Sequence, residues 1–431
     1  MRLVPVLSHH RILGGAAILA LTQLGASIAG LLRDRLLAQT FPDLAVVDAY
    51  IAAFRPSDLL FQVLVMSAIG MILVPLIARE QHRSDREGVA NLLGASMGLG
   101  CLVFGVVAVP VTLVLPMFAP WLVNFQGEQL ALYINFARIV LISDLLMVIG
   151  NTAGQELINI ERYWVYGLTP IVYSLGTIAG TLFLTPIIGP YGPIAGTAAG
   201  SVIYALWRLL AVRWAGIPLR IKLWHPAIAD MGWMAIPRMI ALGTLHIRLL
   251  ILDTLASSLL TGAITINAYA RNVQSVFVGV IGIALAQAIF SPMCQAAVQG
   301  NEKKFQHFVR RGSLFMLLFT IPSALILLLI PDLVAWIVNL QHRATAFSVV
   351  LMIYALSIPI ESLSYLLIRA FFALHNTRLP AIAHVANAIV AIALSWSLLG
   401  VYGLPAIPIG FVAGHMLQLL ILWWNVPRKM S

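Results

Sequence analysis

The sequence predicts an all-α polytopic membrane protein, with about twelve transmembrane helices in two six-helix lobes. Hydrophobic residues make up 61% of the 431 positions and charged residues only 10%, whereas about a quarter of a typical soluble domain is charged. The apolar residues also occur in runs of about 20, which is the length of helix that crosses a hydrocarbon core of about 30 Å. The short alternating segments of a membrane β-barrel do not occur in the sequence.

The apolar runs define the expected membrane crossings. We expect helices over residues 12–32, 57–79, 90–117, 131–155, 164–186, 191–213, 232–258, 268–296, 310–331, 345–369, 378–399 and 403–424. The first run follows Arg2 and Arg11 and superficially resembles a secretion signal. No small-residue cleavage site closes it and a second hydrophobic run follows soon, so we expect this helix to be retained.

Basic residues concentrate on one side of these crossings. With the N-terminus inside, 19 of the 26 Lys and Arg residues fall in cytoplasmic stretches or helix ends, and Arg208 is among them. The opposite loops hold almost none, with Arg343 as the clear exception. The positive-inside rule therefore predicts an inner-membrane protein with both termini in the cytoplasm. It also accounts for the net charge of +10 without a nucleic-acid partner.

Two short patterns recur along the chain. The sequence GPYGP at 189–193 is followed 211 residues later by GVYGL at 400–404, and DAY at 48–50 is followed 219 residues later by NAY at 267–269. Both offsets are close to half of the chain. They predict a duplication of six helices, and an even number gives both copies the same orientation in the membrane.

The predicted duplication divides the chain into two lobes. We expect an N-terminal lobe over residues 1–214, a cytoplasmic linker over 215–231 and a C-terminal lobe over 232–431. Parallel repeats of this kind, related by an axis along the membrane normal, are typical of transporters that work by alternating access.

Pairs of small residues four positions apart mark expected close contacts between helices. Gly94 with Gly98 and Gly196 with Gly200 have this spacing. The pattern lets two helix backbones approach each other in a membrane.

Charged residues inside the predicted membrane segments are the candidate site. An ionised side chain at the bilayer centre costs about 2.5–3.5 kcal/mol on insertion scales, so such residues usually face a cavity or a partner. The candidates identified on these grounds are Arg33, Asp34, Asp48, Arg55, Arg248, Asp253 and Arg271.

Each candidate has a structural alternative. Arg33 could snorkel to the outer interface, and Arg55 with Asp58 could form a purely structural pair, because they are three apart on one helix face. Arg248 and Asp253 are five apart, about 140° around a helix, so we expect each to have a partner on another helix.

A cleft that is rich in arginine favours an anionic ligand. The guanidinium fork matches phosphate and carboxylate groups, so we expect a substrate such as a pyrophosphate-linked lipid head group. No phosphate loop, nucleotide-binding motif or catalytic triad is evident in the sequence. Cys101 and Cys294 lie inside apolar runs, and the histidines form no metal-binding pattern. We therefore expect a transporter rather than an enzyme, with no cofactor and no metal.

Several segments resemble the MurJ/MviN family. They are GLLRDRLLA at 30–38, DAYIAAF at 48–54, the helix AYAR…GVIGIAL at 268–285 and RAFFALHNTRLP at 369–380. The resemblance spans nearly the whole chain. It implies the multidrug/oligosaccharidyl-lipid/polysaccharide (MOP) exporter superfamily, in which two six-helix lobes surround a cationic cavity and flip undecaprenyl-pyrophosphate-linked sugars. In the MurJ family the cargo is lipid II, the precursor of peptidoglycan.

The resemblance also implies roles for individual residues. Arg33 and Asp34 match the Arg-Asp pair in the family's first helix, and Asp48 matches its functional aspartate. Thr265 stands where the family carries a hydroxyl group in the cavity.

Three positions depart from the family pattern. Ser27, Phe61 and Asn272 stand where the family has arginines, and the nearby Arg271 is displaced from Asn272 by one residue, or about 100° of helix. Lipid II and another lipid-linked glycan, for example for an exopolysaccharide, both remain candidate cargoes. A multidrug/cation antiporter on the same fold and a transport-inactive scaffold are the alternative functions. Either a coupling ion or the membrane potential could drive transport.

Overall fold

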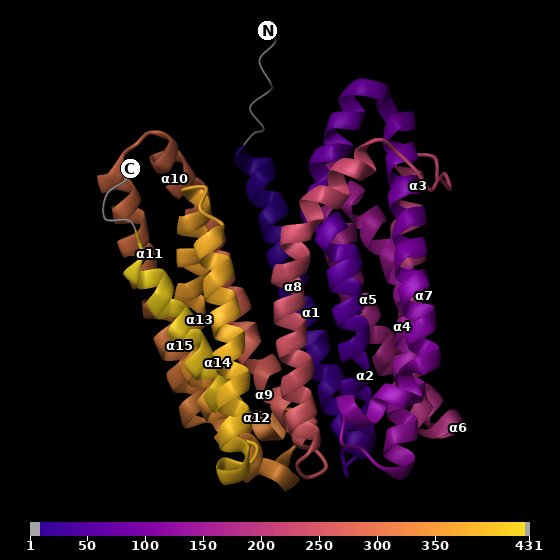
Figure 1. Ribbon diagram of the computed structural model, residues 1–431, viewed down its shortest axis with the longest axis vertical. Coiled ribbons are helices and arrows are strands. Elements are labelled where there is room, and N and C mark those ends of the chain that lie inside the picture. Colours follow the sequence, from indigo (N-terminus) through magenta and orange to yellow (C-terminus); the bar gives the residue numbers. More distant parts are fainter. Residues whose placement is uncertain (1–8, 427–431) are drawn as a thin grey trace. The chain divides into compact units, whose positions relative to one another are not determined.

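The described part of the chain is helical throughout. The computed structural model describes residues 9–426, apart from the side chains at 9–17, 19–20, 71, 83–85, 230, 233–234 and 237. Within this part every regular element is an α-, 3-10 or π-helix, which confirms the predicted all-α class. The elements, drawn in Figure 1, are α1 (His9–Thr40), α2 (Ala45–Phe61), η1 (Gln62–Met66), α3 (Ser67–Leu122), α4 (Gly127–Asn159), α5 (Tyr163–Ala179), η2 (Gly180–Leu184), α6 (Thr185–Ile188), η3 (Gly189–Tyr191), α7 (Gly192–Trp214), α8 (Ala227–Ser257), α9 (Ala263–Phe277), η4 (Val278–Ile283), α10 (Ala284–Val298), α11 (Glu302–Leu329), α12 (Pro331–Ile337), η5 (Gln341–Arg343), α13 (Ala344–Ala373), α14 (Arg378–Tyr402) and α15 (Ala406–Trp424).

Many of these helices are long and apolar enough to cross a membrane. Ten stretches of the described residues meet this criterion, and the longest, Tyr163–Trp214, contains both α5 and α7. Another, Ala45–His82, joins α2, η1 and the first part of α3, and the rest of α3 supplies the next, Arg86–Leu122. Together with α1 the pattern fits the predicted number of about twelve helices in a multi-pass membrane protein.

Several helices begin earlier than the sequence predicted, and two of these differences involve residues of the candidate site. We expected the second helix from residue 57 and the eighth from residue 268, but α2 begins at Ala45 and α9 at Ala263. The polar residues in the first turns of these helices were therefore wrongly placed before the helix. The reason is tertiary: Asp48 in α2 accepts hydrogen bonds at the start of α9, so each N-terminal extension stabilises the other.

A π-helical interruption recurs at related places in the two halves of the chain. The α2 helix passes through η1 before it continues as α3, and α9 passes through η4 before it continues as α10. The first residues of η1 and η4, Gln62 and Val278, are 216 residues apart, between the two offsets found in the sequence. A π-bulge of this kind often marks a functional site in a helix.

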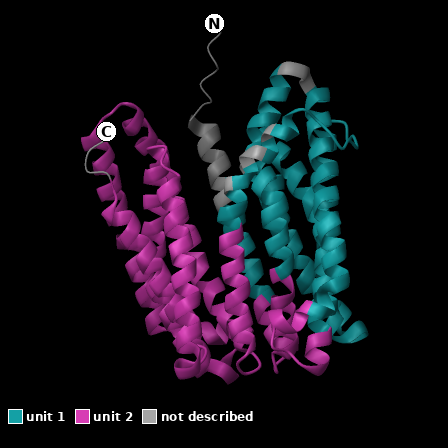
Figure 2. Cartoon of the chain, in the orientation of Figure 1, with its two compact units in different colours: residues 1–33, 56–117, 132–242 teal, residues 34–55, 118–131, 243–431 magenta. Residues whose placement is uncertain are grey.

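The chain packs into two compact units, coloured separately in Figure 2. Unit 1 comprises residues 1–33, 56–117 and 132–242, and unit 2 comprises residues 34–55, 118–131 and 243–431. Helix α8 contributes to both units, because the division falls between Leu242 and Gly243. The lobe boundaries around residues 215–231 that the sequence suggested stay a prediction.

In unit 1, glycines bring α5 and the η2 turn that follows it into backbone contact with α7. A Cβ atom on Gly180 would meet the backbone of Gly196, and a Cβ atom on Gly176 would meet that of Gly200. The predicted close contact at Gly196 and Gly200 is therefore confirmed. Two helices that approach this closely gain van der Waals contact along their whole crossing.

The other glycine pair of unit 1 has a different partner. A Cβ atom on Gly94 or Gly98 of α3 would collide with the carbonyl group of Arg220 or Lys222. These residues belong to the extended connection between α7 and α8 rather than to a helix. The expected helix–helix contact at Gly94 and Gly98 was therefore wrong; the two glycines carry a connecting segment instead.

Unit 2 has its own apolar core, which lies among α10, α11, α13 and α15. Met293, Phe305, Phe371 and Leu422 each contribute a fully buried side chain to it, one from each of these helices. The core anchors α13, whose opposite surface carries the polar residues described next.

Candidate functional site

Buried polar side chains gather on facing helices of unit 2. They come from α1, α2, α8, α9, α13, α14 and α15, and those from α2 onward belong to stretches that are long and apolar enough to span a membrane. Seven of the eight residues proposed from the sequence lie in unit 2, and Arg33 is the last residue of the first segment of unit 1. Because polar groups are costly in an apolar medium, their individual partners indicate what each one does.

An ion pair joins α2 to α8. The Nε atom of Arg55 donates to a carboxylate oxygen of Asp253, and both side chains are largely buried, with 12% and 5% exposure. Asp253 therefore has its partner on another helix, as the helical spacing predicted. A buried ion pair of this kind is strongly destabilised when one partner is removed alone.

Arg248 of α8 is hydrogen-bonded to the first of a series of amide side chains on other helices. Arg248 donates from Nη1 to Oδ1 of Asn387 at 2.6 Å, and Nδ2 of Asn387 donates to Oε1 of Gln418 at 2.5 Å. The guanidinium group also lies over the ring of Phe411, with its Cζ atom 5.2 Å from the centroid. The Nε atom of Arg248 is buried and has no hydrogen-bond partner in the described part of the chain. Arg248, like Asp253, thus has its partner on another helix, as predicted.

Arg271 lies on a polar face of α9 between two amides. Asn267, four residues before it, accepts from the hydroxyl group of Tyr354 at 2.8 Å. Gln274, three residues after it, donates to a carboxylate oxygen of Glu361 at 2.8 Å. Both amides are therefore bound to α13.

Arg271 itself is half-buried and makes no hydrogen bond or ion pair with any described residue. Its electrostatic neighbours include Arg55, Asp253 and Glu361, and Arg248 is also within electrostatic reach. Three guanidinium groups thus accompany two carboxylates, which leaves a formal charge of +1. A positive excess inside a low-dielectric site attracts an anion.

Asp48 and Thr265 are brought together at the start of α9. Asp48 accepts from the backbone N–H groups of Gly262 at 2.6 Å and Thr265 at 2.8 Å, and from the Thr265 hydroxyl group at 2.5 Å. Gly262 has a φ of +92°, which favours glycine, and this turn points its N–H group at the carboxylate. Asp48 therefore caps α9 from a distant helix, because it satisfies N–H groups that have no partner within α9.

Asp34 also contacts α9. Its side chain accepts from Nδ2 of Asn272 at 2.9 Å, and its backbone carbonyl accepts from the Tyr269 hydroxyl group at 2.7 Å. Asp34 is buried, and Arg33 beside it is half-buried. That these residues, or any of the eight, bind substrate stays a prediction.

The residues that stand in place of the family's arginines make contacts within the fold. Phe61 is buried in the core of unit 1 and meets the ring of Phe104 edge-on, at 6.1 Å between centroids. Asn272 holds Asp34, and the hydroxyl group of Ser27 donates to the carbonyl group of Gln23.

Sequence reasoning missed the uncharged members of the polar network. Asn267, Gln274, Asn387 and Gln418 connect the charged residues to α13, α14 and α15, but no single one is unusual in a membrane helix. Asn267 and Gln274 are seven residues apart, so both fall on one helix face, and that face also contains Arg271. This spacing was the feature of the sequence that could have identified the polar face of α9.

Unit 1 contains a buried arginine that the sequence assigned to a cytoplasmic helix end. Arg208 of α7 is only 2% exposed and lies inside the helix bundle. It donates to the hydroxyl group of Thr169 at 3.1 Å, the carbonyl group of Gly150 at 3.2 Å and that of Tyr166 at 3.1 Å. Its Cζ atom is also 4.6 Å and 4.3 Å from the ring centroids of Tyr166 and Tyr204. The sequence did not predict that partners on neighbouring helices would enclose this side chain, and its location at the cytoplasmic end of a helix stays a prediction.

A half-buried carboxylate also lies in unit 1. Asp144 of α4 accepts a hydrogen bond from the hydroxyl group of Ser57, and Asp58 is its electrostatic neighbour. Among the described residues, no group of three or more His, Cys, Asp or Glu side chains is placed to hold a metal ion.

The chain is similar to known proteins over most of its length. The family model described as "Lipid II flippase MurJ" matches residues 37–431. A "Probable lipid II flippase MurJ" of Rhizobium tropici is 24% identical over 394 residues, which cover 86% of this chain and 73% of the relative.

Two solved structures share the fold. A structure of "Lipid II flippase MurJ, inward closed conformation" superposes with a TM-score of 0.80 at 18% identity, and covers 95% of this chain and 87% of that one. An inward-facing multidrug resistance MATE transporter of the MOP superfamily also has a TM-score of 0.80, at 16% identity, over 94% of this chain and 97% of the other. Because the family model spans nearly the whole sequence, the chain belongs to the MurJ lipid II flippase family.

Proposed function

We propose that this chain flips a polyprenyl-pyrophosphate-linked saccharide, lipid II or a related glycan lipid, across the bacterial inner membrane. Membership of the MurJ family supports the class of cargo. The observation that carries the proposal at the level of residues is the positive excess within unit 2, where Arg271 has no partner among the described residues. A guanidinium group without an internal partner is free to bind a pyrophosphate in bidentate fashion.

The proposed mechanism is alternating access without covalent chemistry. The polar network of unit 2 binds the pyrophosphate and is exposed first to the cytoplasm and then to the periplasm. Arg55 and Arg248 have partners, Asp253 and Asn387, and contribute charge at a distance, while Arg271 makes the direct contact. The driving force is the membrane potential or a coupling ion, and both termini lie in the cytoplasm as the distribution of basic residues predicts.

The acidic residues do not favour a multidrug/cation antiporter. Asp253 is bound to Arg55, Glu361 to Gln274, and Asp48 to the start of α9. A cation would have to displace one of these donors before it could bind. If the chain were a transport-inactive scaffold, the unmodified protein would flip no lipid, and charge substitutions in unit 2 would change nothing in a flipping assay.

Rescue of cells depleted of their own lipid II flippase tests the cargo. Growth and normal shape on expression of this chain support lipid II. If the chain is present in the membrane but growth fails, purified protein in vesicles is tested with lipid II and with another undecaprenyl-pyrophosphate sugar, and accessibility of the head group is the readout. Flipping of neither lipid would contradict the proposal.

A paired substitution tests the arginines. Replacement of both Arg33 and Arg248 by alanine should abolish flipping while the protein still reaches the membrane. Arg343→Ala is the matched control, because Arg343 is exposed and lies outside the polar network of unit 2. Full flipping by the double variant would exclude these two arginines from the site.

A further inference from the structure

A connecting segment in unit 1 lies on α3 as an extended chain. Residues 215–226, called here the α7–α8 segment, contain turns and irregular backbone but no helix. They cross α3 at Gly94 and Gly98, where any Cβ atom would collide with the carbonyl group of Arg220 or Lys222. The two glycines therefore fix the segment against the helix rather than leave it free in solvent.

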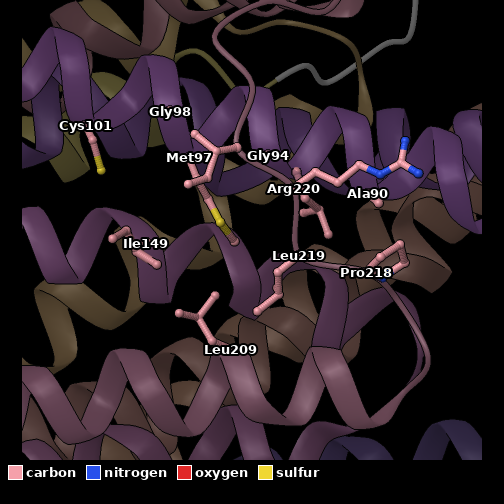
Figure 3. Close-up of a pocket in the computed structure, with 12 residues that line it drawn as sticks. Ala90, Gly94, Met97, Gly98, Cys101, Ile149, Leu209, Pro218, Leu219 and Arg220 are labelled. Carbon is pink, nitrogen blue, oxygen red and sulfur yellow. The ribbon is translucent and has the colours of Figure 1, made fainter.

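An apolar pocket of about 480 Å³ lies beside this crossing (Figure 3). It is formed by one side each of α3, α4 and α7 together with the α7–α8 segment. Six of the side chains that line it are Leu93, Met97, Cys101, Ile149, Leu209 and Leu219. Its volume falls within the range of about 300–1,000 Å³ that is typical of small-molecule sites. The guanidinium group of Arg220 extends away from the apolar residues in Figure 3.

Cations lie on and next to the α7–α8 segment, and the backbone of Lys222 contacts Gly98, which lines the pocket. Arg213, Arg220 and Lys222 are exposed, and the guanidinium group of Arg86 lies next to Gly216 of the segment. Arg220 is bound to Glu87 at 2.8 Å. Lys222 and Arg213 have no ion-pair or hydrogen-bond partner among the described residues. The positive charge at this rim is therefore available to an anion.

The same segment exposes large apolar side chains. Ile221 is 96% exposed and Trp224 64%, and Trp214 at the end of α7 is 72% exposed. Aromatic residues next to unpaired cations are characteristic of the membrane–water interface, where the ring enters the head-group layer and the cation contacts lipid phosphate. The α7–α8 segment thus has the chemistry of a membrane-surface element.

We propose that this pocket binds an acyl chain of an anionic phospholipid, with the phosphate of its head group against Lys222. The apolar lining suits a hydrocarbon chain and excludes a polar ligand, and the unpaired cation at the rim selects an anionic head group over a zwitterionic one. The bound lipid holds the segment against α3, α4 and α7. This site is separate from the polar network of unit 2 and does not depend on which glycan lipid is the cargo.

Cys101 provides a direct readout of occupancy. It lines the pocket, and Cys294 in unit 2, the other cysteine in the sequence, is an internal control. The whole protein is placed in nanodiscs of phosphatidylglycerol or phosphatidylcholine, and the rate at which a small membrane-permeant maleimide labels each cysteine is measured by peptide mass spectrometry. We expect phosphatidylglycerol to slow labelling of Cys101 several-fold and to leave Cys294 unchanged.

Matched variants separate the pocket from general effects of the lipid. Leu209→Trp fills the pocket and should make the labelling rate of Cys101 independent of the lipid. Leu210→Trp places the same ring on the exposed side of α7 and should keep the difference. Lys222→Gln should reduce the protection by phosphatidylglycerol, whereas Lys303→Gln, a surface change in unit 2, should not.

Two outcomes would overturn the proposal. One is an equal rate of Cys101 labelling in both lipids with the unmodified protein, a test that needs no variant to fold. The other is protection of Cys101 by undecaprenyl phosphate in detergent under conditions where phosphatidylglycerol gives none. That result would assign the pocket to the tail of the cargo.

Discussion

Two arginines within membrane-spanning stretches, one in each unit, have opposite surroundings. Arg208 in unit 1 uses Nε, Nη1 and Nη2 in hydrogen bonds and stacks between two tyrosine rings. Arg271 in unit 2 makes no hydrogen bond or ion pair with a described residue. A charge that is fully satisfied inside the bundle stabilises the fold, whereas we propose that the charge left without such partners serves a ligand. The two arginines therefore differ in the number of their internal partners, and also in burial, since Arg208 is 2% exposed and Arg271 is half-buried.

This contrast predicts a ranking of variants in which the loss of stability falls as the number of internal partners falls. The largest expected effect is that of Arg208→Ala. It removes three hydrogen bonds, to Thr169, Gly150 and Tyr166, and the cation between two rings, so we expect a loss of at least about 3 kcal/mol in the free energy of unfolding. Thermal unfolding of the purified protein in detergent measures it.

Arg208→Lys is the matched control for this loss. A lysine keeps the charge but lacks the planar fork that reaches three acceptors, so it should recover only part of the stability. Wild-type stability of Arg208→Ala would break the comparison, because a satisfied arginine would then contribute nothing to the fold.

Asp48→Ala tests whether the ranking depends on the unit or on the partners. Asp48 belongs to unit 2 and accepts three hydrogen bonds, so we expect a loss of about 2 kcal/mol despite its location beside the candidate site. Thr265→Val removes one of the three bonds and should cost about 1 kcal/mol. If Asp48→Ala abolished flipping without a change in unfolding temperature, Asp48 would be a ligand-binding group rather than a cap.

Arg248 is intermediate, because it has one hydrogen bond, to Asn387, and a buried Nε atom without a described partner. Arg248→Met should cost about 1 kcal/mol, since it leaves Oδ1 of Asn387 without its donor but also removes a poorly satisfied buried charge. Addition of Asn387→Leu should restore part of the loss. A double-mutant cycle of unfolding free energies measures the coupling, and additive effects would show that the two side chains act independently.

The fold was largely predictable from the sequence, and the exceptions share one physical cause. Hydropathy located about twelve helices, but Asp48 and Arg55 made the start of α2 look like a loop. Both lie within the helix, where Thr265 and Asp253 bind them. These partners are more than 190 residues away in sequence, so the local pattern does not reveal them. The burial of Arg208 was not predicted for the same reason. Hydropathy is calculated for each segment alone. A charged residue whose partner lies on a distant helix therefore looks the same in the sequence as one that is exposed to water.

The candidate site was predictable only in its charged members. Arg248, Asp253 and Arg271 were recognisable because an ionisable residue in an apolar run is rare. Their amide partners were not, because Asn and Gln are common hydrogen-bond donors between membrane helices. The sequence also could not distinguish Arg271, without an internal partner, from Arg55, with one. That difference depends on which residues face each arginine across the bundle.

Arg271→Gln has the smallest expected effect on stability and the sharpest effect on function. Since no described residue loses a partner, we expect the free energy of unfolding to change by less than about 0.5 kcal/mol. Flipping of the glycan lipid should nevertheless be lost, because the neutral amide removes the positive excess beside Asp253 and Glu361. Arg271→Lys keeps the charge and should retain part of the activity, which distinguishes a charge requirement from a steric one. Unfolding temperature and vesicle flipping are measured on the same preparations. If Arg271→Gln unfolded as easily as Arg208→Ala while its flipping per folded molecule stayed normal, the two arginines would share one structural role.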